Sequence, residues 1–266
     1  AIFVSFIINT AMRPNQFLLL HTIFWTGLIG LSSCKSDKSN ITITGSRTEM
    51  TAEWDDMPNE KAAQVFAPYK AKVDSIMDPV IGESAMDMTA KRPESLLSNL
   101  VADVLRNSAT PYIGRPADVA IINVGGLRNS LSKGEITYRE IYEILPFENS
   151  LCILSLKGSD VKELMKDIIK VGGEGLSNVH MAVNKDMDII DVKIGQQPIN
   201  DDQLYEIATV DYLAEGNDRM TAFKRAEKRI CVEEATIREI FLEYVKSEAA
   251  KGRALTSKME GRVTIL

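Results

Sequence analysis

Short apolar runs and helical stripes of apolar residues alternate over residues 58–266 of this chain. Continuous apolar runs such as 119–122 and 151–156 are typical of strands buried on both faces. Apolar residues spaced three and four apart, as in 94–107 and 160–171, indicate helices with one buried face. The alternation predicts a single mixed domain, of the α+β or α/β class, in which helices pack on sheets.

The same pattern sets the bounds of the predicted elements. Helices are predicted over 58–77, 94–107, 138–145, 160–171 and 236–250. Strands are predicted over 80–82, 119–122, 135–137, 151–156, 179–183, 189–194, 204–210 and 261–265. We expect the first helix to pack its apolar stripe, Ser159 to cap the helix that follows it, and 172–178 to form a flexible loop.

The first 33 residues differ from the rest because Arg13 is their single charged side chain. The run 16–33 has three interpretations: a membrane span, which needs about 20 apolar residues, a buried core helix, or a secretory signal. The third is favoured, since Leu31-Ser32-Ser33-Cys34 resembles the lipobox of bacterial lipoproteins. We therefore expect a leader over 1–33, with 1–11 an upstream extension, and acylation of Cys34.

The polar stretch that follows, residues 34–57, is expected to form a tether between lipid and domain. The chain carries 31 Lys and Arg against 37 Asp and Glu, a formal net charge of −6. This sign argues against a general nucleic-acid binder, which needs a basic patch or stripe.

Cys152 and Cys231 lie in apolar contexts and are expected to be buried thiols and not a disulfide.

Polar and aromatic side chains follow the ends of several predicted strands. Asn123-Val124-Gly125-Gly126 follows the strand 119–122 and leads to Arg128, while Phe147 and Asn149 precede the strand 151–156. Tyr212 to Asp218 follows the strand 204–210. Ligands of α/β folds bind at such strand ends, so these side chains are candidate site residues.

Several motifs occur in one order: E-S-L-L-S-N-L-V-A-D-V-L (94–105), N-x-G-G-L-R (123–128), G-E-I-T-Y-x-x-I (134–141), L-P-F-x-N-S (145–150), L-K-G (156–158) and Y-L-A-E-G-N-D (212–218). From about Val80 to Leu266 the chain resembles the C-terminal, substrate-specificity domain of bacterial and animal 5′-nucleotidases. The resemblance implies a layered α-β-β-α domain over 58–266.

The resemblance also implies a nucleoside pocket. On residue type alone, Phe147 and Tyr212 would be interpreted as core aromatics. The family, however, has aromatic residues that clamp the nucleoside at both corresponding positions. Stacking of a ring on a base contributes about 1–3 kcal/mol per base. Asn149 is suited to a base edge, Asp218 to ribose hydroxyls, and Arg128 to phosphate or ribose oxygens. The predicted substrate-binding residues are Arg128, Phe147, Asn149, Tyr212, Asp218, Asn123, Gly126, Gly175 and Arg92.

Three positions, Asn217, Arg219 and Glu148, depart from the family pattern. Gly216-Asn217-Asp218-Arg219 stands where the family commonly has Gly-Gly-Asp-Gly, which adds the Arg219 charge beside the pocket. Glu148 replaces a glycine after Phe147, and its carboxylate would repel a polyphosphate. The Glu148 change favours nucleosides or monophosphates, whereas Arg219 would either narrow the pocket or add a phosphate contact.

In the two-domain enzymes of this family, a separate metallophosphatase domain hydrolyses the phosphate ester with two metal ions. The present chain has two histidines, His21 and His180, and no D-x-H, G-D-x-x-D or G-N-H-E stretch. We expect no metal or cofactor in this chain, and divalent metals on a separately encoded metallophosphatase partner that docks near the Gly125–Arg128 and Phe147 loops.

The expected function is therefore a nucleoside- or nucleotide-binding lipoprotein of the bacterial cell envelope. One alternative is a self-sufficient hydrolase using Ser98, Ser130 or Ser177, although the chain has no G-x-S-x-G elbow. Another alternative is a structural envelope lipoprotein with a decayed pocket.

Overall fold

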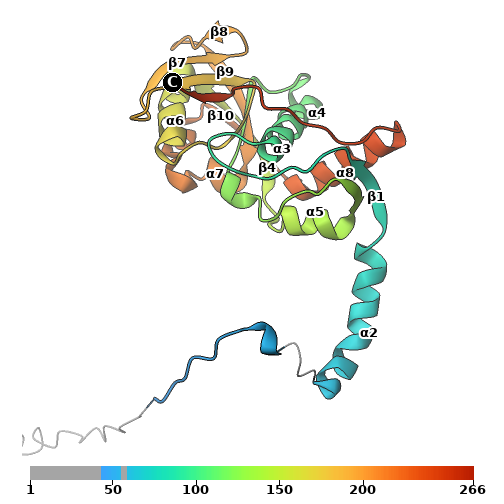
Figure 1. Ribbon diagram of the computed structural model, residues 1–266. Helices are drawn as coiled ribbons and strands as arrows, with labels where there is room; N and C mark the ends of the chain where they lie inside the picture. Colours follow the sequence, from blue (N-terminus) through green and yellow to red (C-terminus); the bar gives the residue numbers. More distant parts are fainter. Residues whose placement is uncertain (1–42, 55–58) are drawn as a thin grey trace, which may run out of the picture. The chain divides into compact units, whose positions relative to one another are not determined.

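The computed structural model describes residues 43–54 and 59–266 (Figure 1). The chain divides into two compact units, residues 1–58 and 59–266, and the first contains the short helix η1 (Ala52–Trp54). The predicted leader and Cys34 lie outside the described residues. No helix in the described ranges is long and apolar enough to cross a membrane.

A five-stranded sheet forms the centre of the second unit, and in spatial order its strands are β10 (Lys228–Thr236), β4 (Ser150–Lys157), β9 (Leu204–Val210), β2 (Val119–Ile122) and β5 (Gly175–Ser177). All but the edge strand β10 are apolar and mostly buried, as is typical of strands covered on both faces. Strands β2 and β9 are parallel neighbours, and β4 runs antiparallel to β9.

Two smaller sheets complete the strand arrangement. A four-stranded sheet has the order β11 (Val263–Ile265), β6 (Val179–Val183), β7 (Ile189–Ile194) and β8 (Gln197–Pro198). A two-stranded antiparallel sheet pairs β1 (Val80–Ser84) with β3 (Gly134–Thr137). The apolar faces of the sheets and helices share one hydrophobic core.

Helices cover the central sheet. Helix α3 (Leu96–Asn107) contacts β2 and β5, and α8 (Ile237–Ala250) packs on α3. Helix α6 (Gly158–Lys170) packs on β4 and β9, and Figure 1 shows it across the strands from α3. Shorter helices occupy the connections: α4 (Thr110–Ile113), α5 (Tyr138–Ile144), α7 (Asp211–Ala214), η2 (Val124–Gly126), η3 (Asn217–Arg219) and η4 (Thr221–Arg225). The predicted mixed α/β class is confirmed.

Helix α2 (Glu60–Met77) forms where the sequence predicts it, and the Asn59 side chain caps it by accepting from the Ala62 N–H at 3.1 Å. The expectation that its stripe packs is wrong, because none of its residues is buried. Phe66, Tyr69 and Val73 are 66%, 69% and 48% exposed. The helix thus presents an apolar stripe that the rest of the described chain leaves open.

The two core-region cysteines form a disulfide, so the expectation of free thiols is wrong. Residues 228–236, not predicted as a strand, form the edge strand β10. Its register places Cys231 directly opposite Cys152 on β4, with their Cα atoms 4.1 Å apart. Cys152 is fully buried whereas Cys231 is exposed, as expected on an edge strand.

Two further local expectations are corrected. Residues 175–177 of the expected loop form strand β5, which pairs with β2 in the central sheet. Ser159 lies inside α6 and does not cap it; the residue at the cap position is Lys157, whose side chain makes no capping hydrogen bond.

Candidate functional site

Seven residues from three loops line one cavity of about 340 Å³, a size within the usual range of ligand pockets. Both aromatic rings face this space and neither is core: Phe147 is 49% and Tyr212 is 40% exposed. The lining residues are Asn123, Gly125, Gly126, Phe147, Asn149, Tyr212 and Asp218. Six of the nine predicted site residues therefore meet in one place.

Strand register explains why residues so far apart in sequence meet. Because β2 and β9 are parallel neighbours, their carboxyl ends lie at the same edge of the sheet. Asn123 follows the first strand, and Tyr212 follows the second. The antiparallel pairing of β4 with β9 sets Leu151 opposite Val210, which brings Asn149 to the same edge.

Two hydrogen bonds fix the Asp218 carboxylate in the wall of the cavity. The Tyr212 hydroxyl donates to Asp218 Oδ1 at 3.0 Å, and Asn123 Nδ2 donates to Asp218 Oδ2 at 3.2 Å. The hydrogen bond to Asp218, together with partial burial, raises the pKa of Tyr212 above its usual value. Both Asp218 oxygens are thus oriented by neighbours and retain lone pairs that can accept further hydrogen bonds.

Asp218 itself has a left-handed backbone, with φ of 52°. The backbone φ of Arg219 is 67°, and that of Gly216, two residues before Asp218, is 81°. The positive φ values of this turn therefore fall on Gly216, Asp218 and Arg219, and not on Asn217. L residues adopt this region at an energetic cost, which is characteristic of functional loops. The turn therefore aims the Asp218 side chain at the cavity.

The Asn149 amide is also fixed by a neighbour. Its Nδ2 donates to Asp211 Oδ1 at 2.8 Å, and the same oxygen accepts from the Tyr212 backbone N–H at 2.6 Å. Asp211 begins α7, and sequence analysis did not single it out. Its position directly before Tyr212 is the pattern that could have drawn attention to it.

A buried arginine holds the loop that carries Phe147. Arg238 on α8 donates to the Pro146 carbonyl at 3.0 Å and to Glu148 Oε1 at 2.9 Å. Its guanidinium also lies 4.3 Å from the centre of the Tyr142 ring. The Glu148 carboxylate is therefore paired, which weakens the repulsion of phosphate expected from it.

Arg92 and Glu174 form a second support, away from the cavity lining. Glu174 is only 2% exposed, and it accepts from Arg92 Nη2 and from the Val124 N–H, both at 2.5 Å. Burial raises the pKa of Glu174, and the two donors oppose that rise. Glu174, also not singled out from sequence, thereby anchors the turn that carries Asn123.

The remaining predicted residues lie outside the lining. Arg92 is engaged with Glu174, and Arg128 Nη1 donates to the carbonyl of Gly125 at 3.1 Å. Gly175 is buried in β5, where a Cβ would come within 2.6 Å of Ile122. Gly126 does line the cavity, and a Cβ there would crowd Asn123 Oδ1 at 3.0 Å.

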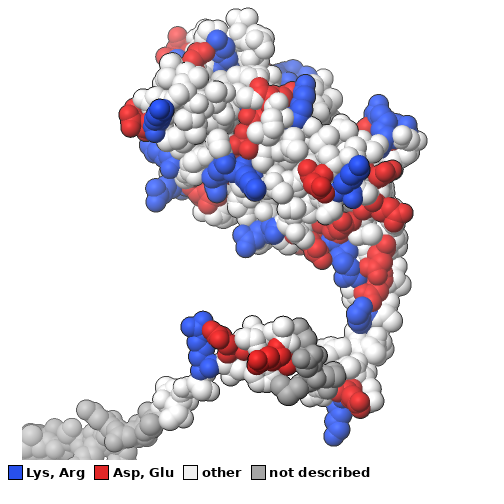
Figure 2. Space-filling model, viewed as in Figure 1, with Lys and Arg blue, Asp and Glu red and all other residues white. Residues whose placement is uncertain are grey.

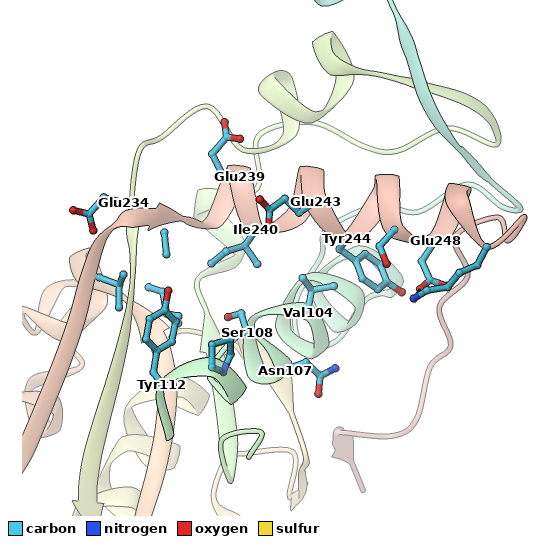
Figure 3. Close-up of a pocket in the computed structure, with 16 residues that line it drawn as sticks. Val104, Asn107, Ser108, Tyr112, Glu234, Glu239, Ile240, Glu243, Tyr244 and Glu248 are labelled. Atoms are coloured by element: carbon cyan, nitrogen blue, oxygen red, sulfur yellow. The ribbon is translucent and has the colours of Figure 1, made fainter. Parts of the chain in front are cut away.

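A larger hollow, of about 700 Å³, lies between α8 and the α3–α4 region (Figure 3). Glu239, Glu243 and Glu248 of α8 line it together with Glu234 of β10. This concentration of carboxylates repels phosphates. The hollow is therefore a poor candidate for a nucleotide site.

Acidic and basic side chains are mixed on the surface of the described chain. On the face drawn in Figure 2, acidic and basic side chains are interspersed and form no basic stripe. Many of them are paired across short distances, as in Arg139 with Asp74 and Asp78 at 2.7 Å.

The donors for a dinuclear metal centre are not assembled in the described residues. No group of three or more His, Cys, Asp or Glu side chains there is arranged to hold a metal ion. Of the serines considered as nucleophiles, Ser98 is fully buried, and Ser177 is 2% exposed with its hydroxyl donating to Asp103 at 2.6 Å. The metal ions of the two-domain enzymes do not fit this part of the chain.

The fold and the cavity define a mixed α/β domain with an aromatic-lined cavity at one edge of its central sheet. The chain belongs to the family of the 5′-nucleotidase C-terminal domain, whose model matches residues 76–225. That family comprises nucleotide-related hydrolases and binds nucleotide substrates.

Similar proteins are longer. The 5′-nucleotidase precursor of Thermus thermophilus is 26% identical with a TM-score of 0.69, over 78% of this chain and 43% of that one. The trifunctional nucleotide phosphoesterase protein YfkN of Bacillus subtilis is 27% identical, over 86% of this chain and 16% of its own length. The cell wall protein Lmo0130 of Listeria monocytogenes is 26% identical, over 77% of this chain and 29% of its own length. The chain thus spans less than half of each of these relatives.

Proposed function

We propose that this chain is the nucleoside- or nucleotide-binding specificity domain of a 5′-nucleotidase system and that the hydrolysis occurs on a separately encoded metallophosphatase. The observation that carries the proposal is the single cavity that Phe147 and Tyr212 share with Asn149, Asn123 and Asp218. Two half-exposed rings can hold a planar base, while the amides and the carboxylate meet its edge and its ribose.

A cell-envelope location, with acylation of Cys34 as the anchor, is the second part of the proposal. The Cys152–Cys231 disulfide supports an oxidising compartment, because disulfides persist outside the reducing cytosol. The relative Lmo0130 is named a cell wall protein. Mass spectrometry of the protein extracted from membranes tests the anchor; a diacylglyceryl-modified Cys34 is expected, and an intact leader contradicts it.

The exposed stripe of α2 supports docking to a second polypeptide. Phe66, Tyr69, Val73 and Ile76 recur at spacings of three and four residues, and we call these four residues the α2 apolar face. All but Ile76 border, together with Arg139, a hollow of about 460 Å³. Uncovered apolar residues grouped on one helix mark interaction surfaces. The relatives contain further polypeptide beside the matched region, and we propose that the partner metallophosphatase covers this face. Docking near the Gly125–Arg128 and Phe147 loops, expected from the sequence, stays a prediction.

The partnership is tested by mixing the purified chain with metallophosphatases encoded in the same genome and measuring phosphate release from AMP with Mn²⁺. At least one should gain activity when the chain is added. No gain with any of them would overturn the partnership. Phosphate release by the isolated chain with Mn²⁺ or Zn²⁺ would instead favour a self-sufficient hydrolase.

A matched pair of variants locates the contact. Val73→Lys places a charge within the α2 apolar face, and Gln64→Lys places the same charge on the opposite side of the helix. Val73→Lys should abolish the gain in phosphate release, while Gln64→Lys should leave it unchanged. Equal behaviour of the two variants would contradict docking through this face.

A further inference from the structure

The hydrogen bond between Asn149 and Asp211 determines which atoms of the Asn149 amide can meet a ligand. An ionised carboxylate only accepts hydrogen bonds, so the amide nitrogen, and not its oxygen, must face Asp211. Turning the amide over would place Asn149 Oδ1 against Asp211 Oδ1 with no proton between them. The carboxylate therefore holds the amide in one orientation.

The held amide has a fixed order of donor and acceptor toward the cavity. It retains its oxygen as an acceptor and one N–H as a donor. Adenine matches this order, because its exocyclic N6 amine donates to the amide oxygen and its ring nitrogen N7 accepts from the amide N–H. This is the bidentate asparagine–adenine pair. A 6-oxo purine presents a carbonyl in place of the amine, and oxygen then meets oxygen.

The second amide of the cavity adds to the same preference. Asn123 Nδ2 is engaged by Asp218, so it too has its nitrogen on a carboxylate. Two carboxylates beside one small cavity produce a negative potential, which favours ligand donors over ligand carbonyls. A freely rotating asparagine would accept either kind of base by turning over; here Asp211 prevents this.

We infer that Asp211 is a positioning residue that makes the cavity selective for bases with an exocyclic amino group, adenine above hypoxanthine. This inference rests on the proposed nucleoside site. Asp211 does not line the cavity and acts through Asn149, and its role is distinct from that of the stacking rings.

The test compares adenosine with inosine, which share a sugar and differ at the purine 6-position, by isothermal titration calorimetry. The wild-type chain should bind adenosine about tenfold or more tightly than inosine, since a matched bidentate pair has an effect of this order. In Asp211→Asn the new amide can donate or accept, so Asn149 can turn over, and the affinity ratio should fall to about 2 or below.

Glu215→Gln is the matched control, because it removes the same charge at the end of the same short helix, where Glu215 pairs with Arg229 and does not line the cavity. It should keep the wild-type ratio. If Asp211→Asn does not fold, Asp211→Ser supplies the same two-way hydrogen bonding and the same expected ratio.

The outcomes separate the inference from the function. A wild-type chain that binds both nucleosides equally, or an Asp211→Asn variant that retains the tenfold preference, would overturn the inference and leave the nucleoside site standing. Binding of neither nucleoside by the wild-type chain would overturn the proposed function and the inference with it.

Discussion

The hydroxyl of Tyr212 donates a hydrogen bond of 3.0 Å to Asp218 Oδ1, six residues further along the chain. In the proposed site, Tyr212 would thus supply both a ring that stacks on the base and a hydroxyl that orients the carboxylate facing the sugar. Tyr212→Phe separates the two roles, because the ring remains and the hydroxyl is lost. The Kd for adenosine should rise about fivefold, the size of one modest hydrogen bond.

Calorimetry measures this change, and Tyr69→Phe on α2 is its control, since Tyr69 is exposed and lies outside the cavity. Equal affinity of Tyr212→Phe and the wild-type chain would show that the hydroxyl does not orient Asp218 for the ligand.

Arg238 is predicted to act on binding through the Phe147 loop. Arg238→Ala removes the donors to the Leu145 and Pro146 carbonyls and to Glu148. We expect the free energy of unfolding to fall by about 1–3 kcal/mol and the Kd for adenosine to rise, because the Phe147 ring loses its fixed position. Chemical denaturation and calorimetry measure the two effects.

Arg229→Ala is the control for this prediction, as it breaks an exposed pair with Glu215 and should change stability by less than about 1 kcal/mol. An unchanged Kd in Arg238→Ala would mean that the loop keeps its conformation without the guanidinium.

Arg92→Ala is predicted to lower the free energy of unfolding by an amount that depends on pH, because it removes the partner of Glu174. Burial already raises the pKa of Glu174, and loss of the guanidinium raises it further. Above that pKa the Glu174 carboxylate of the variant is a buried charge without its guanidinium partner, so the free energy of unfolding should fall by about 1–3 kcal/mol. This loss is smaller than that for a fully buried ion pair, because Arg92 is partly exposed.

The sign of the pH effect follows from proton uptake. A folded state with a raised carboxyl pKa binds more protons than the unfolded state, so its stability decreases as pH rises through that range. The difference between Arg92→Ala and the wild-type chain should therefore shrink as pH is lowered from about 8 to about 5. Urea denaturation across this range measures it, and a constant or growing difference would contradict the role of Glu174.

The disulfide is predicted to stabilise the domain by closing a long loop, since the two cysteines are 79 residues apart. Cys152→Ser with Cys231→Ser should lower the free energy of unfolding by about 2–4 kcal/mol. A reducing agent should produce the same loss in the wild-type chain and none in the double variant. Equal stability of the wild-type chain with and without reductant would contradict the bond's contribution.

Apolar patterning predicted the elements whose burial is regular. The strands at Val119–Ile122 and within Ser150–Lys157 are fully apolar or nearly so, and α3 and α6 have one clear apolar face. Strand β10 was missed because an edge strand exposes most of its residues, so charges interrupt its pattern. The disulfide was missed with it, because only the register of β10 against β4 shows that Cys231 faces Cys152.

The residues of the candidate site also fall into those that the sequence could predict and those that it could not. The aromatic rings, Asn123, Asn149 and Asp218 belong to motifs, and a resemblance can therefore identify them. Glu174 and Asp211 act through hydrogen bonds to residues that are distant in sequence. The position next to Tyr212 could point to Asp211, but no local spacing reveals that its partner is Asn149 or that the partner of Glu174 is Val124. The packing role of Gly175 likewise depends on the approach of Ile122.

The central claim is that Phe147 and Tyr212 grip a nucleoside base, and adenosine-induced thermal stabilisation tests it most directly. At a concentration of about 100 times Kd, binding should add about 2.7 kcal/mol, equivalent to a rise in Tm of about 5–10 °C. Phe147→Ala with Tyr212→Ala should abolish this rise, whereas Phe66→Ala with Tyr69→Ala, an exposed pair on α2, should retain it. A rise that survives the loss of both cavity rings, or no rise in the wild-type chain, would contradict the account.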